Sequence, residues 1–190
     1  MISVTTFSRH KLLILTALVE GLVLVAALLI AWFFGIKLFP LTRNIFNDMV
    51  IGTLGALIPL VFFVFLLSEK VNNTPLLGSL KKTIINDIRV IFSESRLIDL
   101  CFISLFAGFA EELLFRGVIQ VKSGIIVASI IFGLLHFITP AYFIIATFMG
   151  FYLGFLFQYY ESLLIPIQLH FVYDLGALLY LRYFYNSTIN

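Results

Sequence analysis

Long apolar runs, separated by short polar segments, make up most of this chain. Each run is about 20 residues long, the length that an α-helix needs to cross the hydrocarbon core of a bilayer. The alternation of apolar and polar positions that membrane β-strands show is absent from the sequence. The pattern therefore predicts an all-α, polytopic transmembrane helical bundle. The expected spans are residues 12–35, 49–67, 97–121, 125–138, 141–159 and 163–183.

One segment, residues 75–92, has a different pattern. Apolar residues recur there at helical spacing while charged and amide side chains occupy the other side. The apolar positions are Leu77, Leu80, Ile84, Ile88 and Ile91. Thr74 followed by Pro75 is typical of a helix start. We expect an amphipathic helix at the membrane surface, the alternative being a soluble linker helix.

The composition supports the membrane assignment. Of 190 residues, 62% are hydrophobic and only 12% are charged, and the mean hydropathy is +1.11. Water-soluble domains of this size do not have such a composition. We expect one integral-membrane domain over 1–190, with N-terminal spans and the surface helix in 1–95 and the catalytic helices in 96–185. The single cysteine, Cys101, excludes an internal disulfide and a cysteine metal cluster.

The charges outside the spans predict a topology. Eight basic residues fall on the side that holds the chain ends and the 69–96 segment, and three fall on the other side. The positive-inside rule then places both termini in the cytoplasm, in a bacterial or archaeal plasma membrane. The net charge of +2 is too small to suggest nucleic acid as a partner. The expected partners are the lipid bilayer and a membrane-associated substrate.

The third span contains an unusual group of charges, Glu111, Glu112 and Arg116. Charged residues inside a membrane are costly and usually functional. On a helix Glu112 and Arg116 share one face and can form an ion pair. Glu111 is rotated about 100° away and is free to face a cavity. The alternative is that all three form a structural ion network between helices.

Further ionisable residues lie in other spans: His136 in the fourth, and His170 with Asp174, four positions apart, in the last. Burying them together costs less than burying them separately, because they can share hydrogen bonds and water. We therefore expect them to converge with Glu111 on one cavity. Glu20 interrupts the first span and either marks a membrane interface or faces the bundle interior.

Glutamate and histidine without a nucleophilic serine or cysteine suggest hydrolysis by activated water. A glutamate paired with a histidine can take a proton from water, and a second histidine can stabilise the resulting oxyanion. The same ligand types, Glu111, His136 and His170, could instead hold a divalent metal such as zinc with water in the open position. The HExxH motif of helical zinc proteases is absent from the sequence.

Three motifs in this order resemble those of the CAAX protease and bacteriocin-processing (CPBP, or Abi) family of intramembrane proteases, which includes the Ras-converting CAAX endoprotease. They are EExxxR at Glu111–Arg116, FxxxH at Phe132–His136 and HxxxD at His170–Asp174, and the resemblance covers about residues 97–185.

The resemblance implies a helical-bundle peptidase in which Glu111 and His136 activate water while His170 and Asp174 orient the carbonyl and stabilise the oxyanion. Glu112 and Arg116 would support the site. The CAAX endoprotease branch has asparagine in place of Asp174, and an ionised aspartate cannot donate a hydrogen bond to an oxyanion. Asp174 is therefore protonated, orients His170 or binds a metal.

The function expected from these residues is an intramembrane endopeptidase that acts on a membrane-associated or lipidated protein or peptide. No cofactor is required if glutamate activates the water, and a metal stays the alternative. Two other functions are open: a non-catalytic membrane immunity or scaffolding protein, and a proton-coupled carrier. In straight spans Glu111 would lie nearer the outer face and His136 nearer the inner, so either the span boundaries are shifted or the helices are staggered and tilted.

Overall fold

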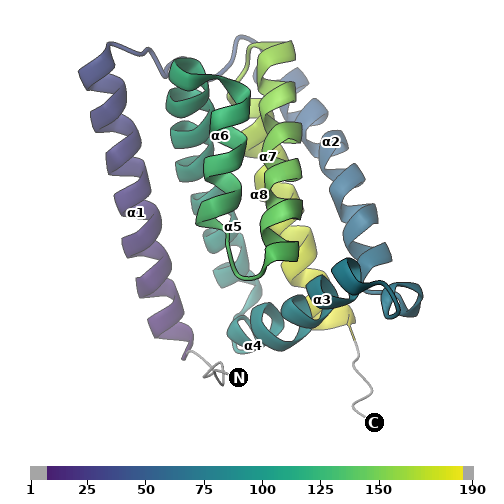
Figure 1. The fold of residues 1–190 in the computed structure, drawn as a ribbon. Helices are drawn as coiled ribbons and strands as arrows, with labels where there is room; N and C mark the ends of the chain where they lie inside the picture. The colour runs from purple at the N-terminus through teal and green to yellow at the C-terminus, as the bar shows by residue number, and fades with distance from the viewer. Residues whose placement is uncertain (1–7, 186–190) are drawn as a thin grey trace.

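The computed structural model describes residues 8–185, and its elements are helices throughout this range (Figure 1). In chain order they are α1 (Arg9–Phe34), α2 (Ile45–Leu66), η1 (Glu69–Val71), α3 (Pro75–Thr83), η2 (Ile84–Ile88), α4 (Arg89–Ile91), α5 (Leu97–Glu112), η3 (Leu113–Gln120), α6 (Val121–Leu135), α7 (Pro140–Tyr160), α8 (Leu164–Leu179) and η4 (Tyr180–Phe184). The all-α, polytopic class is confirmed. Residues 1–7 and 186–190, which the expected domain of 1–190 includes, lie outside the described residues.

Five helical segments are long and apolar enough to cross a membrane, and one of them, Leu97–Leu135, has 39 residues. A straight helix of that length would extend about 58 Å, nearly twice the thickness of the hydrocarbon core. The segment instead folds back at Gly124, whose φ of 83° and ψ of 166° are non-helical. Glycine adopts positive φ without strain. The chain therefore turns here, and α5 with η3 and α6 run in opposite directions along the bundle (Figure 1).

The fourth predicted span, 125–138, is shorter in the structure. The helix ends at Leu135, so only residues 125–135 follow the break at Gly124. They rise about 17 Å, roughly half of the hydrocarbon core. Thr139 does not end this helix but begins the next one, accepting a hydrogen bond on its side chain from the Tyr142 backbone N–H at 3.2 Å.

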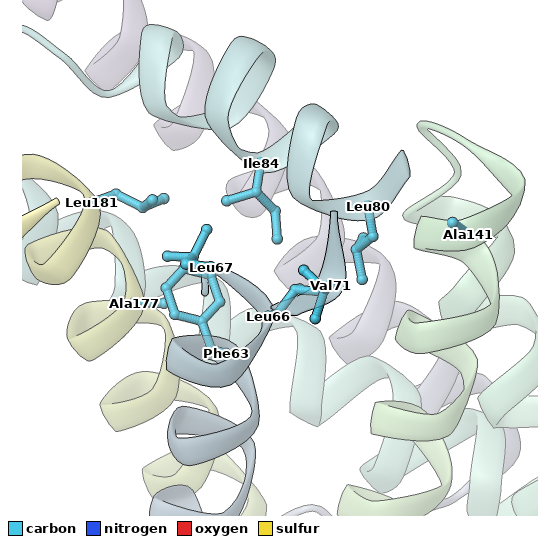
Figure 2. Packing of buried hydrophobic residues seen from close by; sticks show 9 residues of the cluster. All are labelled: Phe63, Leu66, Leu67, Val71, Leu80, Ile84, Ala141, Ala177 and Leu181. Carbon is cyan, nitrogen blue, oxygen red and sulfur yellow. The ribbon is translucent and has the colours of Figure 1, made fainter. Parts of the chain in front are cut away.

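Helices α3, η2 and α4 lie across one end of the bundle, the end at which both chain termini lie (Figure 1). Their apolar side is buried against α2, α7 and α8 in one cluster (Figure 2). The cluster consists of Phe63, Leu66, Leu67, Val71, Leu80, Ile84, Ala141, Ala177 and Leu181. The predicted amphipathic helix is thus present and covers the bundle end. Thr74 precedes it as expected, but its hydroxyl donates to Val71 O at 2.6 Å and does not cap the helix.

Helix α1 is joined to α5 by an ion pair near its start. Arg9 donates to both carboxylate oxygens of Asp99, from Nε at 2.6 Å and from Nη2 at 2.8 Å. The buried residues of α1 are Leu12 near one end and Ala27 and Ala31 near the other. Helix α1 is therefore attached to the bundle at its two ends.

The GxxxG pair of α7 provides close packing, as predicted, and also two hydrogen-bond acceptors. A Cβ at Gly150 would lie 3.0 Å from Ser129 Cα, and one at Gly154 would lie 2.7 Å from Gln120 Oε1. The backbone carbonyls of Gly150 and Gly154 accept hydrogen bonds from Arg116 and Gln120, respectively, each at 2.9 Å. Pro166 lies in the first turn of α8, where a missing backbone N–H breaks no helical hydrogen bond.

Candidate active site

Glu112 and Arg116 form the predicted ion pair in the bundle interior. Their side chains are 0% and 1% exposed, and Arg116 donates from Nη1 to Glu112 Oε1 at 2.9 Å. Arg116 also donates to the carbonyl of Gly150 in α7 and lies 4.7 Å from the ring centroid of Phe132 in α6. The guanidinium therefore connects three segments, which supports the structural role expected for this pair.

Glu111, the adjacent residue, points in a different direction. Its side chain lines a cavity of about 420 Å³ in the interior of the bundle, together with His136, His170 and Asp174. The four residues that the sequence assigned to the site are therefore brought together, from three separate segments of the chain.

His136 lies at the end of α6 and faces Glu111. Its Nε2 is 3.5 Å from Glu111 Oε2, and its Nδ1 is 2.8 Å from the carbonyl of Phe132. A carbonyl only accepts hydrogen bonds, so Nδ1 carries a hydrogen, and in the neutral ring Nε2 then presents its lone pair to Glu111. The imidazole also stacks on Phe132, with ring centroids 4.3 Å apart. Its orientation is fixed from two directions.

Glu111 and His136 lie at the same depth because of the turn at Gly124. They are 13 and 12 residues from that glycine on either side of the turn, so both lie about 18–20 Å from it along the bundle. Of the two explanations considered for their apparent separation in straight spans, a shifted span boundary applies, because α6 ends beside Glu111 and does not cross the whole membrane.

His170 is held more tightly than His136. Its Nδ1 is 2.8 Å from Glu112 Oε1, and its Nε2 is 3.4 Å from Asp174 Oδ2. The sequence predicted only Arg116 as a partner of Glu112. In the structure Glu112 Oε1 accepts hydrogen bonds from both Arg116 and His170. The contact between Asp174 and His170 favours the orienting role over the other two considered for this aspartate.

The sequence did not assign three other residues to the site. Phe132 contacts His136, His170 and Arg116 with its ring and is 3% exposed. Tyr142 and Tyr173 line the cavity. Phe132 is the first residue of the FxxxH motif, and its spacing of four before His136 places both on one helix face; the tyrosines carry no such signal.

Glu20 lines the same cavity, which decides between the two positions considered for it. It faces the bundle interior. The cavity is otherwise mainly apolar, and α3, η2 and α4 close its end through Leu80, Ile84, Ile88 and Ile91. A buried apolar chamber with a few polar groups gathered at one level is the usual form of a small-molecule or peptide site.

Within residues 8–185, no group of three or more His, Cys, Asp or Glu side chains is arranged to hold a metal ion. Both ring nitrogens of His170 lie near carboxylate oxygens, Nδ1 at 2.8 Å from Glu112 and Nε2 at 3.4 Å from Asp174.

The structure thus defines a class, a membrane-spanning helical bundle with a buried glutamate–histidine site. Residues 93–176 match the family described as "Type II CAAX prenyl endopeptidase Rce1-like". The resemblance predicted from the three motifs is therefore confirmed over this segment, which contains all of them. The five long apolar segments agree with an integral membrane protein.

A curated relative covers nearly the same share of the chain. "Uncharacterized protein YpbD" of Bacillus subtilis (strain 168) is 39% identical over 87 residues, which are 44% of this chain and 46% of that protein. The match therefore spans about half of the relative's length. No solved structure matches this chain.

Proposed function

We propose that this protein is an intramembrane endopeptidase that hydrolyses a peptide bond of a membrane-associated or lipidated protein or peptide. The observation that carries the proposal is the pair of Glu111 Oε2 and His136 Nε2, 3.5 Å apart on the cavity wall. Both atoms offer lone pairs, so a molecule that donates two hydrogens, such as water, satisfies both. The match to an endopeptidase family supports the same reaction class.

In the proposed reaction Glu111 takes a proton from this water. The water oxygen forms a bond to the carbonyl carbon of the substrate, and the carbonyl oxygen becomes an oxyanion. The C–N bond then breaks, and the proton passes from Glu111 to the leaving nitrogen, which gives a carboxylic acid and an amine. His136 holds the water through Nε2 while Phe132 fixes the ring.

His170 is the proposed oxyanion donor. Glu112 fixes its Nδ1, and the contact of Nε2 with Asp174 is long, at 3.4 Å. A developing oxyanion can therefore compete with Asp174 for the Nε2 hydrogen, and the charge of the oxyanion strengthens that bond. Asp174 acts by orienting the ring. The proposed steps use only side chains of this protein and water.

The test is cleavage of a quenched-peptide library, part of it with lipidated C-termini, by the full chain in detergent. Glu111→Gln preserves size and polarity but removes the base, and we expect it to lower turnover by about 10²–10⁴-fold. The matched control is Glu69→Gln, the same change at an exposed position, and it should cleave like the wild type.

Two outcomes would contradict the proposal. Equal cleavage by the wild type and Glu111→Gln would show that Glu111 is not the base. Loss of wild-type activity on adding a chelator, restored by zinc, would show that a metal activates the water. A scaffolding protein should keep its cellular phenotype with Glu111→Gln, and a peptidase should not.

A further inference from the structure

The middle of α1 forms one wall of the cavity, and the proposed reaction does not use it. Thr16 and Glu20, four residues apart and therefore on one face, are the α1 residues that line the cavity. The buried residues of α1 are nearer its ends, at Leu12, Ala27 and Ala31. Between these two attachments, Glu20 lines the cavity.

The ion pair of Arg9 and Asp99 places Glu20 at the level of Glu111. Helices α1 and α5 run in the same direction (Figure 1). Glu20 is 11 residues after Arg9, and Glu111 is 12 residues after Asp99, so the two glutamates are about 17–18 Å along the bundle from the same ion pair. Glu20 is therefore at the depth of the proposed reaction.

One carboxylate oxygen of Glu20 lacks a partner. Its Oε2 is buried and accepts no hydrogen bond within residues 8–185. The groups that interact with it electrostatically are Glu111, His136, His170 and Asp174. A buried carboxylate oxygen without a donor is unfavourable. An occupant of the cavity that brings a donor to Glu20 would remove this cost.

The charges around the cavity indicate the kind of donor. Glu112 and Arg116 form a buried pair that is neutral as a whole. The ionisable acids and histidines left on the lining are three carboxylates and two imidazoles, and none of the described lining residues is lysine or arginine. With all three carboxylates ionised, one negative charge is in excess even if both imidazoles are protonated, and two are in excess with His136 in the neutral form described above. The group that best complements this lining is a cation.

We infer that Glu20 is a substrate-binding residue that selects peptides carrying a lysine or arginine side chain near the cleaved bond. The inference rests on the proposed function for the cleaved bond, but the binding of a cationic peptide does not require cleavage. Glu20 touches the substrate side chain and takes no part in the proton transfers.

The experiment measures peptide binding and cleavage separately. A fluorescein-labelled library of apolar hexapeptides carries lysine, norleucine or glutamate at each position in turn. Binding is measured by fluorescence anisotropy to the full chain in detergent with Glu111→Gln, so that the peptides stay intact. We expect lysine at one position to tighten binding by at least about tenfold over norleucine.

Three variants in the same background test the role of Glu20. Glu20→Gln should remove the lysine preference, and Glu20→Lys should transfer it to the glutamate peptide, which a merely structural residue would not do. Thr16→Val changes the other polar α1 residue of the lining and should keep the lysine preference.

The outcomes separate this inference from the proposed function. Equal binding of the lysine and norleucine peptides at every position, or a lysine preference that survives Glu20→Gln, overturns the inference. Cleavage by the wild type with no preference that depends on Glu20 overturns it and leaves the peptidase proposal standing. A lysine preference that depends on Glu20, in a protein that cleaves none of these peptides or the lipidated library, supports the binding site and contradicts the peptidase proposal.

Discussion

Two glutamate–histidine pairs lie side by side in this protein, and each contains one of the two consecutive glutamates. The pairs differ in the distance between their charged atoms and in the exposure of their side chains. Glu112 and His170 are 2.8 Å apart, with side chains 0% and 7% exposed. Glu111 and His136 are 3.5 Å apart, with side chains 14% and 29% exposed. Because consecutive helical residues point about 100° apart, one pair is enclosed by the bundle and the other faces its cavity.

The difference shows how one short motif can supply both support and chemistry. The enclosed pair has further partners in Arg116 and Asp174, so its members are held in place. The open pair is fixed only on its histidine side, by the Phe132 carbonyl and ring. Each glutamate has a buried Oε2 without a hydrogen-bond partner within residues 8–185, but Glu112 is held through Oε1 by Arg116 and His170, whereas Glu111 is left to accept a proton on the cavity side.

The largest expected effect comes from replacing each of the two glutamates separately with glutamine. Glu112→Gln leaves the charge of Arg116 uncompensated in the bundle interior, and we expect it to lower the free energy of unfolding by about 3–5 kcal/mol. Glu111→Gln, the same change one residue earlier, should leave stability nearly unchanged. Thermal unfolding of both variants in detergent measures the difference. Equal losses would mean that the two glutamates are not divided between support and chemistry.

The two histidines should differ in the same way, one variant affecting turnover alone and the other affecting both turnover and stability. His136→Asn keeps a polar side chain but removes the proposed water ligand, and we expect turnover to fall by about a hundredfold or more with little change in melting temperature. His170→Asn should lower both, because the ring connects Glu112 and Asp174. Parallel measurements of cleavage and melting check this. A melting temperature lowered equally by both variants would contradict the assignment.

A smaller effect is expected at the contact behind Arg116. In Gly150→Ala the added Cβ would lie 3.0 Å from Ser129 Cα and 3.2 Å from Ser129 O, both backbone atoms that cannot move aside easily. We expect a loss of about 1–3 kcal/mol in unfolding free energy. The control is Gly21→Ala, whose Cβ would meet nothing within 4 Å. Equal stability of the two variants would show that α6 and α7 are less closely packed than described.

The smallest effect should follow loss of the α1 attachment. Arg9→Gln removes the two hydrogen bonds to Asp99, and Arg9 is partly exposed, so the change should be local. We expect faster amide hydrogen exchange in the first turns of α1 and unchanged exchange around His170. Faster exchange in α8 as well would show that α1 supports the enclosed pair and not only the cavity wall.

Much of the fold follows directly from the sequence. Apolar runs and the spacing from Leu77 to Ile91 predicted the spans and the surface helix, because burial in lipid fixes helix length and helical periodicity fixes the buried face. The pairing of Glu112 with Arg116 followed from their spacing. The short α6 did not, since Phe137 and Ile138 are as apolar as the residues before them and hydropathy does not show where a helix stops.

The sequence predicted which residues lie together at the candidate site, but not the contacts among them. Glu111, His136, His170 and Asp174 were expected to converge, and they do. The hydrogen bond of His170 to Glu112 was missed because the rotation of α8 against α5 is set by packing. At Gly108 a Cβ would lie 3.1 Å from the backbone N of Phe171, and such close approach cannot be read from one sequence. The position of Glu20 likewise depended on how α1 attaches.

The shortness of α6 also affects the surrounding lipid. Its exposed side chains, among them Ile126, Ile130 and Leu134, offer lipid an apolar height of only about half the hydrocarbon core. A bilayer next to such a short face becomes thinner locally, since this costs less than exposing chains to polar groups. The thinned region lies next to His136, so a peptide that enters there crosses less hydrocarbon to reach the glutamate–histidine level. A fourth helix of full length would lengthen that path.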